Sequence, residues 1–443
     1  MKTKTFRGGV HPLSNMDYGK GLTSKSCTVM LPVPGTIVIP MSRIIGAPAK
    51  PLVKKGDRVL MGQLIGEAQG FISANIHASV SGNVIAVEDR PHATGIQKLA
   101  VVIENDGRDE IHPDIAPFGT VDSLEPARIT EIAKAVGLVG MGGATFPSHV
   151  KMTVSDQKPV DVVILNGAEC EPYLTADERL MLENPGEVVG GLRLIMKAMG
   201  VRRGIIGIED NKPGCIESMQ KAIEPGEPIE VARLASKYPQ GGEKQLIRAL
   251  LHREVPSGGL PADAGVAVFN VGTAASFYNS VKTGMPSIDR IVTVAGSCIR
   301  EPKNLRVRYG TSFADCIAFC GGLTEEAAKI ISGGPMMGIA QPDDKATVIA
   351  GTSGILALSH KEAGLQQIQN CIRCARCVEA CPVNLMPLSI AAAANSGRFE
   401  ETAKLNANDC IECGACSFIC PSRRPLVQSI RLAKNALRQS ARK

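Results

Sequence analysis

Two runs of four cysteines near the end of the chain have the residue types and spacing that iron–sulfur chemistry needs. Both runs read C-x2-C-x2-C-x3-C-P, one starting at Cys371 and the other at Cys410. In this pattern three closely spaced thiolates hold one [4Fe–4S] cluster, and the fourth reaches the other cluster. The predicted ligand sets are Cys371, Cys374, Cys377 and Cys420 for one cluster, and Cys410, Cys413, Cys416 and Cys381 for the other.

Zinc is the alternative for these cysteines, because four-cysteine zinc sites also use C-x2-C pairs. Two identical runs that are each closed by proline favour the clusters. We expect the fourth cysteine of each run to start a helix, and residues 388–405 to be helical around a Ser-Gly break. Two clusters with exchanged ligands lie close together, so this segment is predicted to relay electrons and to catalyse nothing by itself.

A glycine-rich stretch at 137–151, GLVGMGGATFPSHVK, could approach a phosphate with its backbone amides, and Lys151 would supply a positive charge. The short apolar run 161–165 predicts a buried strand that ends in the polar turn 166–171, where α/β sheets place ligands. Each feature also has an ordinary explanation: many such loops are only turns, Glu169 and Glu171 could be solvated, and asparagines often cap turns.

Taken together, four segments resemble the flavin-binding, NADH-oxidising 51-kilodalton subunit of respiratory complex I and, more closely, the C subunits of Rnf complexes. The segments are GMGGATFPSHVK, NGAECEPYLTADERLM, YPQGGEKQL and FNVGT. The family implies FMN held non-covalently in a Rossmann-like domain, with NAD(H) as its redox partner. At the matching positions, the implied cofactor-binding residues are Gly140, Gly142, Gly143, Lys151, Asn166, Glu169, Gly242, Glu243, Asn270 and Thr273.

The same resemblance implies that Glu169 and Glu171 act in catalysis, at the border of the place where nicotinamide stacks on the flavin. One position departs from the complex I pattern. Phe269 stands where that family has a further asparagine, so one flavin contact differs here.

Short strands with glycine turns between residues 30 and 105 are typical of the barrel-sandwich hybrid of biotinyl and lipoyl carriers. No lysine lies between Gly66 and Gly82, where Phe71 is near the expected attachment point, so we interpret this unit as a docking module. The stretch from Arg290 to Gly322 resembles the β-grasp (SLBB-like) domain that follows the flavin domain in complex I.

The predicted fold is therefore multidomain α/β. Its expected parts are an arm and barrel-sandwich domain (1–110), a Rossmann-like FMN/NADH domain (111–287), a β-grasp domain (288–340), a linker (341–365) and a two-cluster ferredoxin-like helical domain with a basic C-terminal helix (366–443). In that last helix Leu426, Ile430, Ala433 and Leu437 share one face, which could touch anionic lipid or a partner, or simply end in solvent.

Composition excludes several other classes of protein. The 443 residues include only 3% aromatics and carry a net charge of +6, which argues against nucleic-acid binding. No secretory signal and no apolar run of about 18 residues is visible, so we expect no membrane-spanning segment. Fourteen cysteines in such a chain point to metal ligation and not to disulfides. Cys316 and Cys320 share a helix face and are interpreted as small buried hydrophobes.

The resemblance implies an NADH dehydrogenase-type subunit of an ion-translocating ferredoxin:NAD oxidoreductase, peripheral on the cytoplasmic face of the cell membrane. Its implied partners are other Rnf subunits, NAD(H) and, indirectly, ferredoxin. Two alternatives stay open: a cobalamin reductase of the propanediol-utilisation type, and a non-catalytic iron–sulfur relay. The barrel preceded by the segment FRGGVHP (residues 6–12) favours the Rnf assignment over the cobalamin reductase.

Overall fold

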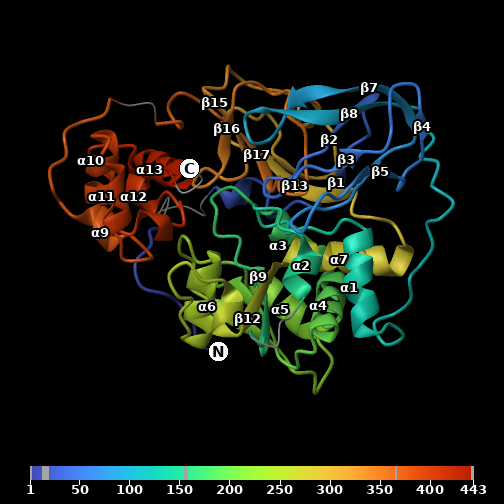
Figure 1. Ribbon diagram of the computed structural model, residues 1–443, viewed down its shortest axis with the longest axis horizontal. Coiled ribbons are helices and arrows are strands. Elements are labelled where there is room, and N and C mark those ends of the chain that lie inside the picture. The colour runs from blue at the N-terminus through green and yellow to red at the C-terminus, as the bar shows by residue number, and fades with distance from the viewer. Residues whose placement is uncertain (1, 12–18, 154–157, 365–366, 441–443) are drawn as a thin grey trace.

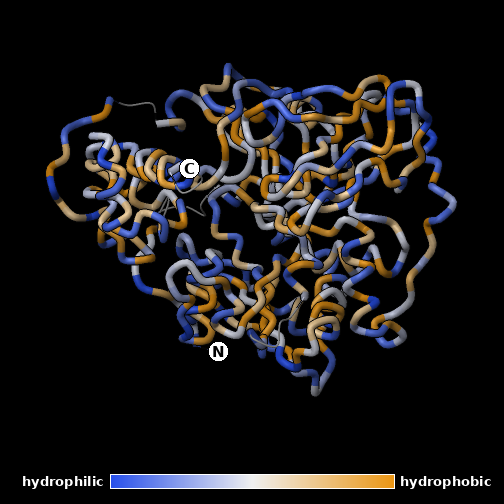
Figure 2. The backbone as a smooth tube through the Cα atoms, viewed as in Figure 1, coloured by the Kyte–Doolittle hydropathy of each residue, from blue (hydrophilic) through white to orange (hydrophobic). Residues whose placement is uncertain are grey.

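The structure is a computed structural model that describes residues 2–11, 19–153, 158–364 and 367–440. Pro12 and the last three residues of the basic tail therefore lie outside the described residues. Four folded units follow one another along the chain, and an N-terminal arm runs between them (Figure 1). Apolar segments gather in the strands and on the inner sides of the helices of each unit (Figure 2).

The first unit is a pair of small antiparallel sheets packed face to face. Ile37, Val59, Ile65 and Ile103 are fully buried between the sheets, and burial of this apolar surface holds the unit together. The loop after β5 exposes Phe71 to 76%. One sheet contains β2 (Thr36–Pro40), β8 (Gln97–Asn105), β7 (Gly82–Pro91) and β4 (Arg58–Val59), and the other contains β3 (Lys50–Pro51), β5 (Leu64–Glu67) and β6 (Ile76–His77).

The second unit is a parallel sheet of β11 (Ile229–Leu234), β10 (Gly204–Glu209), β9 (Val162–Gly167) and β12 (Val266–Asn270), in that order. Successive side chains of β9 enter two different cores, because neighbours on a strand point to opposite faces. One face is covered by α1 (Pro126–Ala135), α3 (Ala176–Glu183), α4 (Pro185–Met199), α5 (Pro213–Ala222) and α7 (Val271–Thr283), and the other by α6 (Glu243–Leu251). Two short helices, α2 (Ser148–Met152) and η2 (Pro261–Ala264), complete the unit.

The third unit is a six-stranded mixed sheet with α8 (Phe313–Phe319). Its strand order is β1 (Val29–Met30), β14 (Lys303–Arg308), β13 (Asp289–Ala295), β17 (Gly354–Leu358), β15 (Lys329–Ser332) and β16 (Ile339–Gln341). The structure differs here from the expected linker at 341–365. Within residues 341–365, β17 is buried at every residue and pairs with β13 and β15. Its sequence, GILAL, carries no polar side chain, so it can be buried on both faces in the middle of the sheet. As expected, Cys316 and Cys320 are buried in this unit.

The fourth unit is helical, with α9 (Arg376–Glu379), α10 (Pro387–Asn395), α11 (Phe399–Lys404), η3 (Ala407–Asp409), α12 (Ala415–Phe418) and α13 (Leu426–Ser440). The predicted helical stretch is present as α10 and α11, separated at Ser396 and Gly397. The prediction that the fourth cysteine starts a helix is wrong. Cys381 and Cys420 instead follow the one-turn helices α9 and α12, because the third cysteine already lies inside each turn.

The basic helix α13 turns its apolar side inward. Leu426, Ile430 and Ala433 are buried, and the helix packs against α10. Lys434 donates to the carbonyl of Cys410 at 2.8 Å. The apolar face is thus taken up inside this unit. Among the described helices, none combines the length and the apolar character that crossing a bilayer requires.

The N-terminal arm contacts three of the units. Lys4 N donates to Arg233 O in the second unit, and Gly9 N donates to Ala380 O in the fourth, both at 2.9 Å. After η1 (Lys20–Leu22), the arm pairs through β1 with β14 of the third unit. Through these contacts the arm connects the second, third and fourth units.

Candidate flavin and iron–sulfur sites

The carboxyl edge of the parallel sheet brings two predicted residues side by side. Asn166 is the second-last residue of β9 and Asn270 is the last residue of β12, and the two are register partners. Asn270 Oδ1 accepts from Gly272 N at 2.8 Å, which caps α7, and its Nδ2 donates to Asp177 at 2.7 Å. Asn166 Nδ2 donates to Gly241 O at 2.8 Å. Both asparagines thus cap turns, and the same bonds assemble the edge.

The glycine-rich loop lies against this edge. A side chain at Gly142 would meet the Asn270 side chain at 3.4 Å. Met141 N donates to Thr273 Oγ1 at 2.9 Å. The buried guanidinium of Arg290, from the third unit, donates to Met141 O at 3.2 Å. The loop is therefore fixed by hydrogen bonds to α7 and to the third unit.

Lys151 reaches the same edge from α2. Its Nζ donates to Val268 O at 2.7 Å and pairs with Glu243 at 3.1 Å. The ammonium also lies 5.4 Å from the centre of the Phe269 ring, a distance at which cation–π attraction acts. The residue that departs from the complex I pattern thus contacts a predicted flavin residue.

The two predicted glutamates point their carboxylates at backbone amides. Glu169, in the left-handed region with φ of 47°, accepts from Asp177 N at 2.8 Å and Glu178 N at 3.1 Å, at the start of α3. A carboxylate is favoured at a helix N-terminus. Glu171 accepts from Met336 N at 3.0 Å and Met337 N at 2.8 Å, in the loop between β15 and β16. Burial raises the pKa of Glu171 to about 7.

Sequence reasoning missed a buried group of charges beneath this edge. Lys20 and Lys212 are 5% and 2% exposed. Lys212 pairs with Glu209 at 3.3 Å and donates to Ala168 O at 2.8 Å. Residues 210–212 form a polar turn directly after the buried strand β10. The rule that singled out the polar turn 166–171 after a buried strand could therefore have found Lys212. No comparable local signal marks Lys20.

The edge has open space and an unpaired polar group, as a site for FMN requires. A side chain built at Gly143 would meet no atom within 4 Å. Gln240 is fully buried, and neither atom of its amide has a hydrogen-bond partner among the described residues. Buried polar groups are normally paired, so this amide fits a ligand at the site. The residues present therefore fit a bound flavin phosphate or ring.

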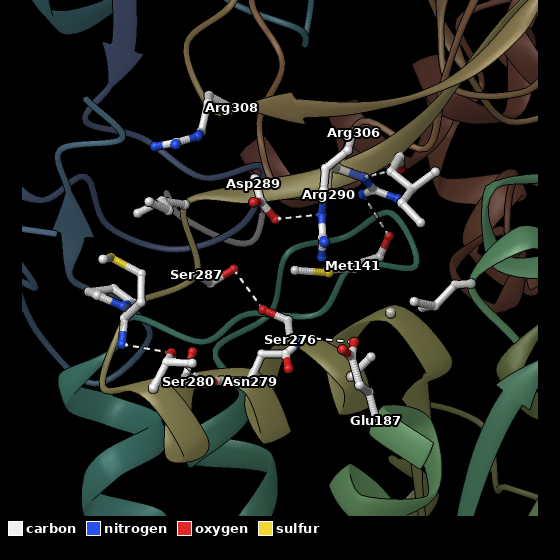
Figure 3. Close-up of a pocket in the computed structure, with 18 of the residues that line it drawn as sticks. Met141, Glu187, Ser276, Asn279, Ser280, Ser287, Asp289, Arg290, Arg306 and Arg308 are labelled. Carbon is white, nitrogen blue, oxygen red and sulfur yellow. Dashed lines mark hydrogen bonds and ion pairs between the residues drawn. The ribbon is translucent and has the colours of Figure 1, made fainter. Parts of the chain in front are cut away.

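A cavity of about 350 Å³ adjoins this edge, between α7 and strands β13 and β14. Figure 3 shows that its polar side chains pair with one another, among them Ser276 with Ser287 and Asp289 with Arg306. Met141 and Asp177 connect the cavity to the glycine-rich loop.

The structure brings the eight predicted cluster cysteines together in the two predicted sets. One hollow is lined by Cys371, Cys374, Cys377 and Cys420. In the other set, Cys381 lies within electrostatic reach of the remaining three, which are Cys410, Cys413 and Cys416. The fold therefore brings the cysteines together in the crossed sets.

The two cysteine loops have matching backbones. Positive φ angles occur at Arg373 and Ala375 in the first loop, and at Glu412 and Gly414 in the second. Amides of these loops turn toward sulfur, since Arg373 N donates to Cys371 Sγ and Glu412 N donates to Cys410 Sγ, both at 3.4 Å. Inward-pointing amides favour an anionic group, and a thiolate-ligated cluster is one.

The spacing of these thiols bears on the zinc alternative. Among the described residues, no three ligating side chains converge closely enough to hold a single metal ion. A tetrahedral zinc site needs four sulfurs at about 2.3 Å from one point. The described residues therefore present no ready-made site for a single ion, for zinc or for any other metal.

One loop joins the flavin edge to the second cysteine set. At its flavin end, Gly241 N donates to Cys170 Sγ at 3.3 Å. At its other end, the buried Tyr238 donates its hydroxyl to Cys413 O at 2.6 Å. Cys170, Tyr238 and Cys413 belong to one apolar cluster. The first set is more open, since Cys371 and Cys374 are exposed.

Comparison with known families matches each unit separately. The matches are to the RnfC barrel sandwich hybrid domain (residues 4–108), the Nuo51 FMN-binding domain (133–279), the SLBB domain (291–340) and the 4Fe-4S dicluster domain (370–423). The predicted fold class is confirmed, and so are FMN and [4Fe–4S] clusters as cofactors.

Curated relatives match along nearly the whole chain. The C subunit of the Na(+)-translocating ferredoxin:NAD(+) oxidoreductase complex of Acetobacterium woodii is 50% identical over 100% of this chain and 99% of its own length. The corresponding protein of the proton-translocating complex of Clostridium ljungdahlii is 48% identical over 98% and 94%. The C subunit of the ion-translocating oxidoreductase complex of Rhodobacter capsulatus is 43% identical over 99% and 84%.

Proposed function

This chain belongs to the family of C subunits of Rnf-type ion-translocating oxidoreductase complexes, and from that premise we propose that it transfers electrons between NAD(H) and its clusters through FMN. When bound, FMN exchanges a hydride with nicotinamide and single electrons with iron–sulfur clusters. The observation that carries the proposal is the loop 238–245, which touches both the flavin edge and Cys413.

Flavin binding is assigned to the carboxyl edge of the parallel sheet. Gly142 and Gly143 would give the loop close approach to the ligand, and Lys151 would supply positive charge near a phosphate. Asn166, Asn270 and Thr273 hold the loop and strand ends in register. Gln240 joins this set, because its unpaired amide lies on the loop that Asn166 holds.

The cysteines are assigned as cluster ligands in the crossed sets. The cluster of Cys381, Cys410, Cys413 and Cys416 would be the inner one, because Tyr238 links it to the flavin edge. The cluster of Cys371, Cys374, Cys377 and Cys420 would be the outer one, with two exposed ligands. Electrons would pass between flavin and partner proteins in that order, in either direction.

The nicotinamide nucleotide is placed beside the loop 169–174. Glu169 and Glu171 shape this loop through their bonds to the amides of α3 and of the β15–β16 loop. Their contribution to NAD(H) use would therefore be to hold the backbone, besides any direct contact with nucleotide hydroxyls.

The partners are proposed to be the other subunits of the complex. The chain would sit peripherally at the cytoplasmic face of the membrane, where NAD(H) and ferredoxin are present. Ferredoxin would exchange electrons with it indirectly, through a further iron–sulfur subunit. The names of two relatives, both C subunits of such complexes, support the first of these proposals.

An anaerobic cofactor inventory combined with NADH titration tests the proposal. The reconstituted chain should contain about eight iron, eight sulfide and one FMN, and NADH should bleach the flavin and then the clusters. Iron and sulfide without flavin, and no NADH–ferricyanide activity after adding FMN, would instead indicate a non-catalytic relay. Stoichiometric zinc without sulfide would overturn the assignment.

A further inference from the structure

Lys20, in the N-terminal arm, reaches across 149 residues of sequence to the loop that carries both glutamates. Its Nζ donates to Glu169 O at 2.9 Å, to Glu171 O at 3.0 Å and to Leu174 O. All three donors of the ammonium are thus directed at carbonyls of one loop. The side chain is buried, with 5% of the residue exposed.

The loop 169–174 depends on such partners, because it follows β9 and precedes α3 without belonging to either. Carbonyls outside regular structure must be paired when they are buried, or each costs about 1–3 kcal/mol. The ammonium of Lys20 pairs three of them at once. The path of the backbone between Glu169 and Leu174 is therefore set by a side chain from the arm.

A buried ammonium is strongly unfavourable without compensating charge. Burial lowers the pKa of Lys20, and the nearby Lys212 lowers it further. Glu169, Glu178 and Glu209 attract the ammonium and offset part of these two effects. The three carbonyls of the loop 169–174 therefore add to these carboxylates in stabilising a charged lysine at position 20.

The arm is held in place directly after Lys20. Thr23 and Thr175 share a hydrogen bond between their hydroxyls at 2.6 Å. Asn304, from β14, donates to Thr23 O at 3.2 Å, and Arg179 donates to Ser24 O at 3.1 Å. Lys20 thus acts from a fixed base and not from a free chain end.

We propose that Lys20 is a positioning residue for nicotinamide nucleotide use, because its hydrogen bonds fix the backbone of the loop 169–174. The inference rests on the proposed placement of NAD(H) beside that loop. The N-terminal arm would then contribute to NAD(H) use by the flavin domain.

The test compares Lys20→Met with Lys25→Met in the full, reconstituted chain. Methionine keeps much of the length of lysine and removes all three donors, and Lys25 is an exposed lysine of the same arm. For Lys20→Met we expect KM for NADH to rise about tenfold and kcat to change by less than about twofold. FMN and iron contents should stay as in the wild type.

Hydrogen exchange gives a readout that does not depend on turnover. Amides of residues 168–175 should exchange at least about tenfold faster in Lys20→Met than in the wild type. Amides of the sheet that contains β9 and β12 should stay protected. Lys25→Met should match the wild type in both measurements.

Unchanged KM and unchanged exchange in a folded Lys20→Met chain would overturn the inference. If that variant does not fold, Thr23→Val decides: faster exchange at 168–175 with a raised KM supports the inference, and wild-type values refute it. A wild-type chain that binds FMN but does not oxidise NADH would instead refute the proposed function, and exchange would still judge the role of Lys20 in the loop.

Discussion

Glu171, in the loop after β9, contacts both the third unit and the N-terminal arm. Its carboxylate accepts the amides of Met336 and Met337 from the β-grasp unit, and its carbonyl accepts the ammonium of Lys20 from the arm. The two amide bonds favour the ionised form, but burial outweighs them and raises the pKa to about 7. The residue thus titrates near neutral pH in the folded chain.

This raised pKa predicts a pH-dependent stability. Between about pH 4.5 and 7 the folded chain keeps a proton on Glu171 that the unfolded chain has released, so stability falls as pH rises through this window. The slope is on the order of 1 kcal/mol per pH unit. Burial and the neighbouring Glu169 also raise the pKa of Asp177 to about 7, so this carboxyl contributes a slope of the same sign. Glu171→Gln should therefore reduce the slope in anaerobic thermal unfolding by about 1 kcal/mol per pH unit, while the exposed Glu325→Gln leaves it unchanged. An unchanged slope in Glu171→Gln would assign the whole titration to Asp177 or another group.

The crossed ligand sets predict which cluster fails when Cys420 is replaced. Cys420→Ala should damage the cluster of Cys371, Cys374 and Cys377, about 40 residues upstream, and reduce iron toward half. Paramagnetic resonance should lose the outer signal and keep the inner one. Cys298→Ala, at a cysteine buried in the core of the third unit, serves as the control. Loss of the inner signal alone would contradict the assignment.

The residues of the flavin and iron–sulfur sites differ in whether the sequence alone could identify them. Cluster cysteines are close in sequence, because one loop wraps one cluster, and their spacing alone gave both sets. Glu169 and Asn270 were found through the resemblance to a family. Lys20 was not, because its partners lie about 150 residues away and nothing near it marks a site. The unpaired amide of Gln240 appears only once the surrounding chain is folded.

At the scale of elements, the local sequence pattern was enough to predict α13 and was not enough to predict β17. The helical spacing of Leu426, Ile430 and Ala433 predicted a helix with one apolar face, and the structure contains it. Which surface covers that face is a long-range property, and α10 provides it. Conversely, GILAL at 354–358 is too short to identify as a strand until β13 and β15 flank it.

The packing of α13 on α10 predicts a difference between two leucine-sized side chains of the same helix. Ile430→Ala should destabilise the ferredoxin unit by about 2–4 kcal/mol, because Ile430 is 1% exposed. Leu432→Ala should change stability little, because Leu432 is 51% exposed. Denaturant unfolding and cluster retention would measure both. Equal effects would indicate that Leu432 is covered by a partner or that α13 is displaced in solution.

At the scale of the whole molecule, the flavin and ferredoxin units meet through few polar contacts. Tyr238 reaches Cys413, Gln245 reaches Pro382 at 3.4 Å, and Ser257 reaches Asp409 at 2.7 Å. In the proposed function, electron transfer between flavin and inner cluster would therefore depend on how firmly the loop 238–245 is held.

Tyr238→Phe should slow this route without emptying either site. Removing the hydroxyl leaves the buried carbonyl of Cys413 without its donor, at a cost of about 1–3 kcal/mol. In stopped-flow mixing with NADH, flavin bleaching should keep its rate, and cluster bleaching should slow by about threefold or more. Tyr278→Phe, against α4 in the flavin-domain core, is the control. Equal cluster rates in all three proteins would place the route elsewhere.

The arm that links the units also has a consequence for how the chain is made. Gly9 leaves the ribosome long before Ala380, its hydrogen-bond partner, exists. At about 5–20 residues per second, the interval is roughly 20 to 75 s. During translation Lys4 and Val10 can pair with Arg233 and Tyr238 once the second unit is made, but the amide of Gly9 must wait for the fourth unit. This contact between the first and final portions of the chain therefore forms only near the end of synthesis.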